Sequence, residues 1–362
     1  MKSRITIIFA AVLIAFASCD KMEQPILFNG DVGESQVVMQ SRITSGDTIK
    51  VRLSYSRFFL DASPFRMIDN ATFELKVNGS PVPAAAKYST EDYLYSLGYV
   101  PAPNDVLDIT VHVPGHESVT AHTVMPQIPS ASNATVTYAG YNYESQLHQY
   151  VVNFRLNDPG NENNFYLISF NGSINEICTH REIHETRVYD TVYINDTFYI
   201  IGPHSVYDTV ILSDTNKVNI SPSFTCRDYL IADPQTDLVG GLGENYEYNE
   251  MFFDDSKING MQHEVQLTVL LSGYYLNDYG YDIYEPYYGY SSCTYDTSTL
   301  NITMELTSYS RDLYLYEQTT NSIDSELGGI ISEPVQIHCN INGGIGIFAG
   351  KTTVTIPIST EH

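Results

Sequence analysis

The sequence predicts a mainly β protein, with an N-terminal Ig-like β-sandwich followed by a larger β-sandwich or open-barrel domain that carries one short helix. Three observations support this prediction. Apolar and polar residues alternate along many short segments, which is the pattern of strands with one buried face. Turn signals separate these segments. The 362 residues suffice for two domains, and the stiff segment PQIPS at 126–130 marks the best boundary between them.

The first domain is expected to span residues 26–126. Segments 47–56 and 106–113 alternate strictly, and the segment 71–82 runs as a strand into Asn78-Gly79, a strong hairpin signal. These short strands with turns between them are typical of a small sandwich. The residues expected to face its core are Ile49, Val51, Leu53, Tyr55, Leu107, Ile109, Val111 and Val113.

The second domain is expected to span residues 127–362, with short strands again separated by turns. The pentapeptide VYDTV occurs at 188–192 and at 206–210, which predicts two paired strands of one extended hairpin. One segment, 308–326, has helical periodicity. Its apolar and partly apolar positions are Tyr309, Leu313, Tyr316, Thr320 and Ile323.

Residues 1–18 have the features of a lipoprotein signal peptide. Lys2 and Arg4 precede an apolar stretch that is too short to span a bilayer, and small residues lie directly before Cys19. Cleavage there would leave Cys19 to carry lipid and residues 19–25 as a tether, so a membrane is the first expected partner. The alternative is an ordinary secretory signal in which the cysteine is incidental.

The chain is strongly acidic, with 43 Asp and Glu against 18 Lys and Arg. The net charge of −25 becomes more negative once Lys2 and Arg4 leave with the signal peptide. Nucleic acid is therefore not expected as a partner, because phosphate binding needs clustered cations. The charge favours a solvated exterior that is repelled by anionic surfaces.

Four cysteines remain besides Cys19, and an exported protein can join them in two disulfides with three possible connectivities. None of the four forms a C-x-x-C pair, which argues against zinc-ribbon and thioredoxin-like sites. The pairing that we expect is Cys178 with Cys226 and Cys293 with Cys339.

A weak candidate metal site comprises His180, Glu182 and His184, which lie on one face if the segment is a strand. Two imidazoles and a carboxylate can hold Zn²⁺. The order H-R-E-I-H differs from the H-E-x-x-H of zinc proteases, so solvent-facing polar residues are the simpler interpretation. No metal and no cofactor are expected.

A tyrosine-rich segment lies between residues 274 and 295 and is the candidate contact loop. Tyrosine offers rigid contact area and a hydroxyl group, which suits binding to a protein or a sugar. The alternative is a surface loop that packs on itself. The residues proposed for contact are Tyr274, Tyr275, Tyr279, Tyr281, Tyr284, Tyr287, Tyr288 and Tyr290.

The glycine run GIGIFA at 344–349 formally matches a dinucleotide-binding fingerprint. That chemistry needs a following helix, whereas the segment after Gly350 alternates as a strand. We therefore expect the glycines to serve a tight turn or a close approach of another backbone segment.

The C-terminal segment SEPVQIHCNINGGIGIFAG, Ser332 to Gly350, resembles the closing motif of domain-of-unknown-function family 4249, a family of Bacteroidota lipoproteins. The segments 157–170, 252–269 and 308–317 fit the same family pattern. The resemblance implies a β-rich lipoprotein that often associates with TonB-dependent outer-membrane transporters. It brings no catalytic residues.

These observations predict a non-enzymatic lipoprotein of the outer-membrane surface that binds a ligand or partner beside a TonB-dependent transporter. Asp20 and Glu23 after the lipidated cysteine resemble surface-export signals and favour display on the cell surface. One alternative is a surface adhesin or structural module. A less favoured one is a hydrolase in the second domain, for which the sequence offers no G-x-S-x-G, phosphate-binding or calcium-binding motif.

Overall fold

The structure is a computed structural model that describes residues 34–58, 61, 63–160, 162–195, 197–232, 247–272, 281–285, 289–325 and 336–358. Strands make up 63% of the chain and helix 4%, which confirms the predicted mainly β fold. Cys19 and the predicted tether lie outside these residues. Within them, no helix combines the length and the apolar character needed to cross a membrane.

The described strands form three sheets. The first has ten strands: β1 (Val37–Thr44), β2 (Lys50–Tyr55), β5 (Lys87–Ser89), β6 (Leu94–Ser96), β11 (Phe165–Ile194), β12 (Thr197–Ile220), β15 (Glu250–Asp254), β17 (Tyr281–Glu285), β18 (Gly289–Tyr309) and β20 (Ile345–Ile358). The second has β9 (Ser130–Asn142), β10 (Leu147–Asn157), β13 (Ser223–Cys226), β14 (Glu247–Tyr248) and β16 (Gln262–Ser272). The third has β3 (Thr72–Val77), β4 (Ser80–Val82), β7 (Val106–His112), β8 (Val119–Val124) and β19 (Ile341–Asn342).

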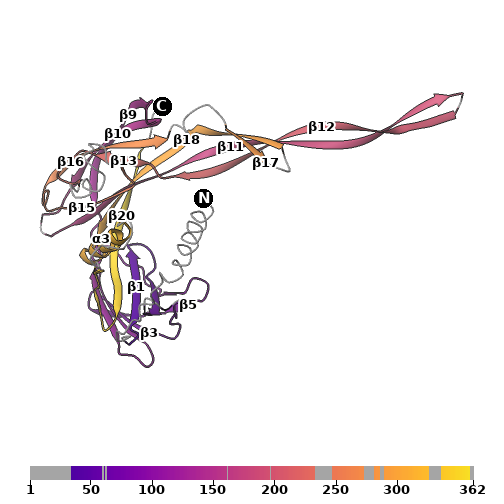
Figure 1. Ribbon diagram of the computed structural model, residues 1–362. Helices are drawn as coiled ribbons and strands as arrows, with labels where there is room; N and C mark the ends of the chain where they lie inside the picture. Colours follow the sequence, from indigo (N-terminus) through magenta and orange to yellow (C-terminus); the bar gives the residue numbers. More distant parts are fainter. Residues whose placement is uncertain are drawn as a thin grey trace, which may run out of the picture.

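One hydrophobic core lies between the third sheet and the β1–β2–β6–β5 end of the large sheet, in the lower part of Figure 1. The alternation of the sequence explains its composition, because every second residue of a strand points inward. Asn78 and Gly79 join β3 to β4 with φ of 52° and 78°, which confirms the predicted hairpin. The predicted inward residues Ile49, Val51, Leu53, Leu107, Ile109, Val111 and Val113 are all buried, and Tyr55 is partly buried.

A second core lies between the second sheet and the part of the large sheet that contains β11, β15, β18 and β20, in the upper part of Figure 1. Large aromatic residues fill it, among them Phe154, Phe170 and Phe224, each at most 2% exposed. Phe170 and Phe224 meet edge to face with ring centroids 5.1 Å apart, an arrangement that aromatic rings prefer.

Strand β20 connects the two cores. Its first half runs parallel to β1, from Ile345 to Lys351, and its second half runs antiparallel to β18, from Lys351 to Ile358. Phe348 and Ile341, both near the C-terminus, are buried in the same core as β1. The predicted division at residue 126 stays a prediction, and the structure adds that C-terminal strands complete the N-terminal sandwich.

The helix predicted at 308–326 is confirmed as α3 (Arg311–Ser325). Ser310 lies just before it, and its carbonyl oxygen accepts the hydrogen bond from Tyr314 N. Ser310 N donates to Gly350 O of β20 at 2.9 Å, and Ser310 Oγ accepts from Gly350 N at 3.2 Å. Leu313 and Tyr316 are buried against β20, together with Ile347 and Ala349. The helix is therefore fixed to the strand that connects the two cores.

The glycine run lies at the start of β20, where this strand runs parallel to β1. A Cβ atom on Gly344 would lie 2.6 Å from Val37 O, and one on Gly346, whose φ is +120°, would collide with Met39 O. The predicted close approach of another backbone segment is thus confirmed, and a strand, not a helix, follows the run.

A buried carboxylate, Asp105, closes the turn before β7. It is 8% exposed and accepts hydrogen bonds from Asn78 Nδ2 at 2.9 Å and from Tyr99 OH and Ala102 N at 2.8 Å. Burial raises its pKa, but the three hydrogen bonds outweigh burial and hold the pKa below its usual value.

Because the pKa of Asp105 is lower in the folded chain than in the unfolded one, its ionised form stabilises the fold above the unfolded pKa, and this contribution is lost as the pH falls through the folded pKa. We expect Asp105→Asn to lower the free energy of unfolding by about 1–3 kcal/mol at pH 7, and by progressively less below pH ~4. Urea titrations followed by circular dichroism at several pH values measure this. An equal loss at all pH values, or the same loss for Asp108→Asn on the exposed face of β7, would contradict it.

Candidate partner-binding arm

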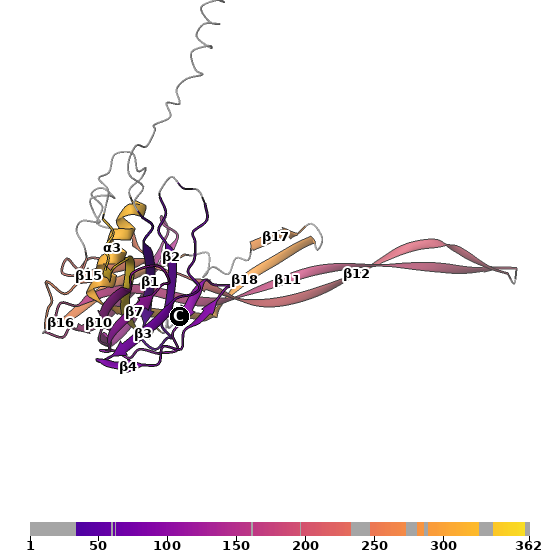
Figure 2. The same ribbon diagram turned by 90° about the horizontal axis from the view of Figure 1, so that it is seen from below.

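Strands β11 and β12 form an exceptionally long hairpin. They pair from Gly172 and Ile220 at the base to Ile194 and Thr197 at the tip. The two VYDTV segments lie in its opposite strands, as predicted. Figures 1 and 2 show the hairpin leaving the body of the molecule.

Among the described strands, a third strand lies beside this hairpin only at its base. β18 pairs with β11 as far as His180 and Ser291. Beyond that point we call the two-stranded part the arm, which consists of Arg181–Ile194 of β11 and Thr197–Ile211 of β12. At about 3.3 Å per residue, the 14 residues of its β11 strand span roughly 45 Å.

The arm exposes an unusual number of apolar side chains. Eight of the 21 exposed large hydrophobic residues in the described chain lie on it. A two-stranded ribbon with no layer packed on it is marginally stable in water, and clustered exposed apolar residues mark contact surfaces. The eight are Val188, Tyr189, Ile194, Ile200, Val206, Tyr207, Val210 and Ile211.

The backbone of the arm is regular except at one position. The register shifts between Tyr189 and Asp190, where Gly202 is the extra residue of β12. Asp190 Oδ2 lies 3.1 Å from His204 Nδ1 across the strands, and both side chains are at least half exposed. Such an exposed pair contributes little stability, so the pairing of the backbone determines the shape of the arm.

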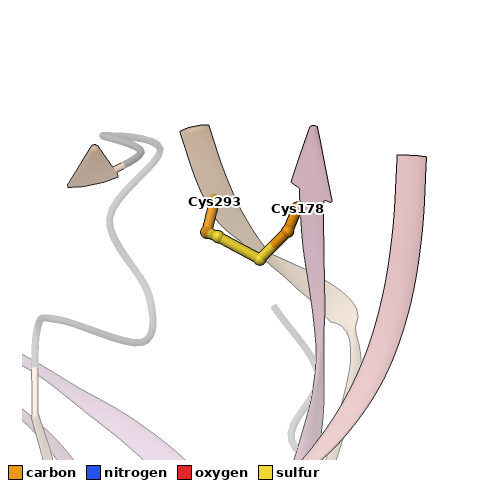
Figure 3. Close-up of a disulfide and its surroundings, with 2 residues drawn as sticks. All are labelled: Cys178 and Cys293. Carbon is orange, nitrogen blue, oxygen red and sulfur yellow. A yellow bond between two sulfur atoms is a disulfide. The ribbon is translucent and has the colours of Figure 1, made fainter. Parts of the chain in front are cut away.

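A disulfide joins Cys178 of β11 to Cys293 of β18 at the base of the arm (Figure 3). Both cysteines are buried. The predicted pairs Cys178–Cys226 and Cys293–Cys339 are therefore wrong, because the register of β11 and β18 places Cys178 directly opposite Cys293. Cys226 and Cys339 are free thiols.

The weak metal candidate falls on the base of the arm. His180, Glu182 and His184 occupy alternate positions of β11, opposite Leu212, Val210 and Asp208. His184 is exposed, whereas the side chains of His180 and Glu182 lie outside the described residues. In the described part of the chain, no three His, Cys, Asp or Glu side chains gather as a metal site would need.

The tyrosine-rich segment lies beside the base of the arm. Tyr274, Tyr275, Tyr279, Tyr287 and Tyr288 are outside the described residues. The backbone of Tyr281 and Tyr284 is in β17 and that of Tyr290 in β18, and Tyr281 is opposite the disulfide cysteine Cys293. The disulfide thus connects the hairpin that carries these tyrosines to the strand that continues into the arm.

A histidine–carboxylate pair that no sequence motif indicates lies in the second sheet. His263 Nε2 of β16 lies 2.5 Å from Asp228 Oδ2, just after β13, and both side chains are mostly buried. Burial raises the pKa of the neighbouring Cys226 thiol to about 11, so this thiol is protonated at neutral pH and is a poor nucleophile. The pair joins two neighbouring strands of the second sheet.

A hollow of about 690 Å³ lies beside β2 in the first sandwich. Its wall includes Arg57, whose guanidinium lies 4.0 Å from the centre of the Phe65 ring, and Arg66, which lies over Tyr55. Each ring covers a face of one guanidinium group, and both arginines are exposed, so these contacts do not form a buried ligand site.

The described residues thus define a β-rich protein of two packed cores, with a disulfide at the root of a projecting two-stranded arm. The chain belongs to the family described as Domain of unknown function (DUF4249), whose model matches residues 23–356. This confirms the family inferred from the C-terminal motif. No curated protein matches the chain.

Proposed function

We propose that this protein is a non-enzymatic lipoprotein of the outer-membrane surface that binds a protein partner through the arm, as an accessory to a TonB-dependent transporter. The arm is the observation that carries this proposal. Eight large apolar side chains project from it into solvent, although the cores of the same chain bury their apolar residues almost completely. A partner that covers the arm would remove this apolar surface from water.

The anchor and the charge support the same proposal. Lipid on Cys19 would hold the chain at the membrane, where a transporter is within reach. The acidic surface would keep the body away from other anionic surfaces, while the arm carries the apolar contact. The family resemblance adds the transporter as the expected partner.

An arm-shortened chain tests the proposal. Arg181 and Ile211 are directly opposite, so residues 182–210 can be replaced by Asn-Gly, which re-closes the hairpin with a two-residue turn. Both disulfide cysteines and both cores remain. We expect affinity-tagged wild-type chain to recover a TonB-dependent transporter from detergent-solubilised outer membranes, and the arm-shortened chain to recover it only at the level of an untagged control.

The control is Tyr143→Ser, which removes an aromatic residue that is 86% exposed in the turn after β9, away from the arm. This variant is expected to recover the partner like the wild type. Undiminished recovery by the arm-shortened chain would refute binding through the arm. If the wild-type chain, but not the arm-shortened chain, recovered a different protein, the arm would still be the contact surface but the transporter role would be refuted. If no membrane partner were recovered and the arm-shortened chain lost attachment to host matrix, the adhesin alternative would be favoured.

A further inference from the structure

Strand β12 is an open sheet edge of unusual length. It is the terminal strand of the large sheet, and its 24 residues pair only with β11 among the described strands. Proteins normally keep edge strands short, bulged or charged, because a free row of N–H and C=O groups pairs with other chains. Apart from the bulge at Gly202 and the adjacent Pro203, β12 therefore presents a feature that most folds avoid.

The other described edges of this protein follow that rule. Of the strands that pair on one side only, β4, β5, β14 and β19 have two or three residues each, and β15 and β17 have five. β9 is longer, but its pairing with β10 is interrupted by two register shifts. From Pro203 to Ile220, by contrast, the pairing of β12 runs without interruption.

The two strands of the arm differ in how well their edges are protected. Residues 181–194 of β11 include five charged residues: Arg181, Glu182, Glu185, Arg187 and Asp190. Residues 197–211 of β12 include a single one, Asp208. Charge protects an edge against pairing, so β12 is the edge that can accept another strand.

The exposed apolar residues of β12 lie on both faces of the arm. Val206 and Tyr207 are adjacent, as are Val210 and Ile211, and neighbouring residues of a strand point to opposite faces. A partner packed on one face would leave half of them in water. A strand added at the edge places side chains beside both sets.

We propose that β12 accepts a β-strand from the partner protein, which extends the arm from two strands to three. This inference rests on the proposed function and specifies how the arm binds. The added strand is apolar on both faces and carries Lys or Arg where it passes Asp208, the one charged residue of the β12 part of the arm.

Amide hydrogen exchange on the purified membrane complex, compared with the isolated chain, tests this mode of binding. Strand addition gives hydrogen bonds to the outward N–H groups of β12 alone. Peptides from 197–211 are therefore expected to gain protection in the complex, and peptides from 181–194 to change little. Equal protection of both strands would overturn strand addition.

A matched pair of substitutions gives a second test. Tyr207 of β12 and Tyr189 of β11 are 64% and 59% exposed, and their register places them on the same face. Tyr207→Lys adds charge at the accepting edge, so partner recovery should fall about tenfold, whereas Tyr189→Lys should stay within about twofold of the wild type. An equal loss of partner recovery in both variants would indicate that the partner packs on the face of the arm that carries the two tyrosines, and would overturn strand addition.

The two proposals fail in different ways. If the arm-shortened chain retains the partner, both binding through the arm and strand addition are refuted. If the partner needs the arm, but β11 and β12 gain equal protection from amide exchange and the two tyrosine substitutions have equal effects, only strand addition is refuted.

Discussion

Replacing Gly346 with alanine is expected to lower the free energy of unfolding by more than about 3 kcal/mol. Two costs combine at this position. Its φ of +120° lies in a region that L side chains rarely adopt, and an added Cβ would collide with the carbonyl oxygen of Met39. Neither backbone can yield easily, because Met39 of β1 also pairs with Leu53 of β2, and β20 continues from Lys351 into its pairing with β18.

Alanine substitutions at two other glycines show how much of the loss comes from the positive φ and how much from the collision. Gly46 has φ of +88° with open space around its Cβ position, so Gly46→Ala should cost only about 1–2 kcal/mol. Gly202 has open space and no positive φ, so Gly202→Ala should change stability by less than about 0.5 kcal/mol. Urea unfolding followed by far-ultraviolet circular dichroism suits a chain without tryptophan. A Gly346→Ala cost no larger than that of Gly46→Ala would contradict the close approach of β1 and β20.

Removing the disulfide is expected to have the second largest effect. Cys178 and Cys293 are 115 residues apart, so their bond restricts the unfolded chain strongly, and replacing both with serine should cost about 2–5 kcal/mol. The loss should concentrate at the base of the arm, where the bond joins β11 to β18. Urea unfolding of the double variant measures the total, and amide exchange of peptides around 178 and 293 locates it.

Cys339→Ser is the control for this experiment. Cys339 is exposed and is a free thiol, so its replacement should leave the unfolding midpoint unchanged. If the double variant matched the wild type, or if Cys339→Ser were as costly as the double replacement, the observed pairing would be contradicted.

Local features of the fold could be predicted from the sequence because local physics determines them. Alternation identified the inward residues of β2 and β7, Asn78-Gly79 identified a hairpin, and three- and four-residue spacing identified α3. The repeated pentapeptide identified the hairpin of β11 and β12. Each of these signals lies within a few neighbouring residues.

Long-range features could not be predicted in the same way. The disulfide pairing depends on the register of β11 against β18, which lie more than a hundred residues apart. The place of β20 between β1 and β18 likewise depends on contacts between the two ends of the chain.

The candidate site likewise combines a local feature that could be predicted with a spatial feature that could not. The segment of the arm was identified as a hairpin, but its apolar residues lie on both faces, as they would in strands buried on both sides. Only the spatial arrangement shows that nothing in the described chain covers them. A signal was available in the sequence: strand-like residues continue from Phe165 to Ile194 and from Thr197 to Ile220, far longer than ordinary strands.

We propose that the arm is the surface through which this protein binds a partner in the outer membrane. The most direct measurement compares the amount of transporter recovered from outer membranes by the wild-type chain and by the arm-shortened chain, with both proteins shown to be folded and oxidised. We expect recovery to fall to background when the arm is shortened. Equal recovery by the two chains would contradict the claim.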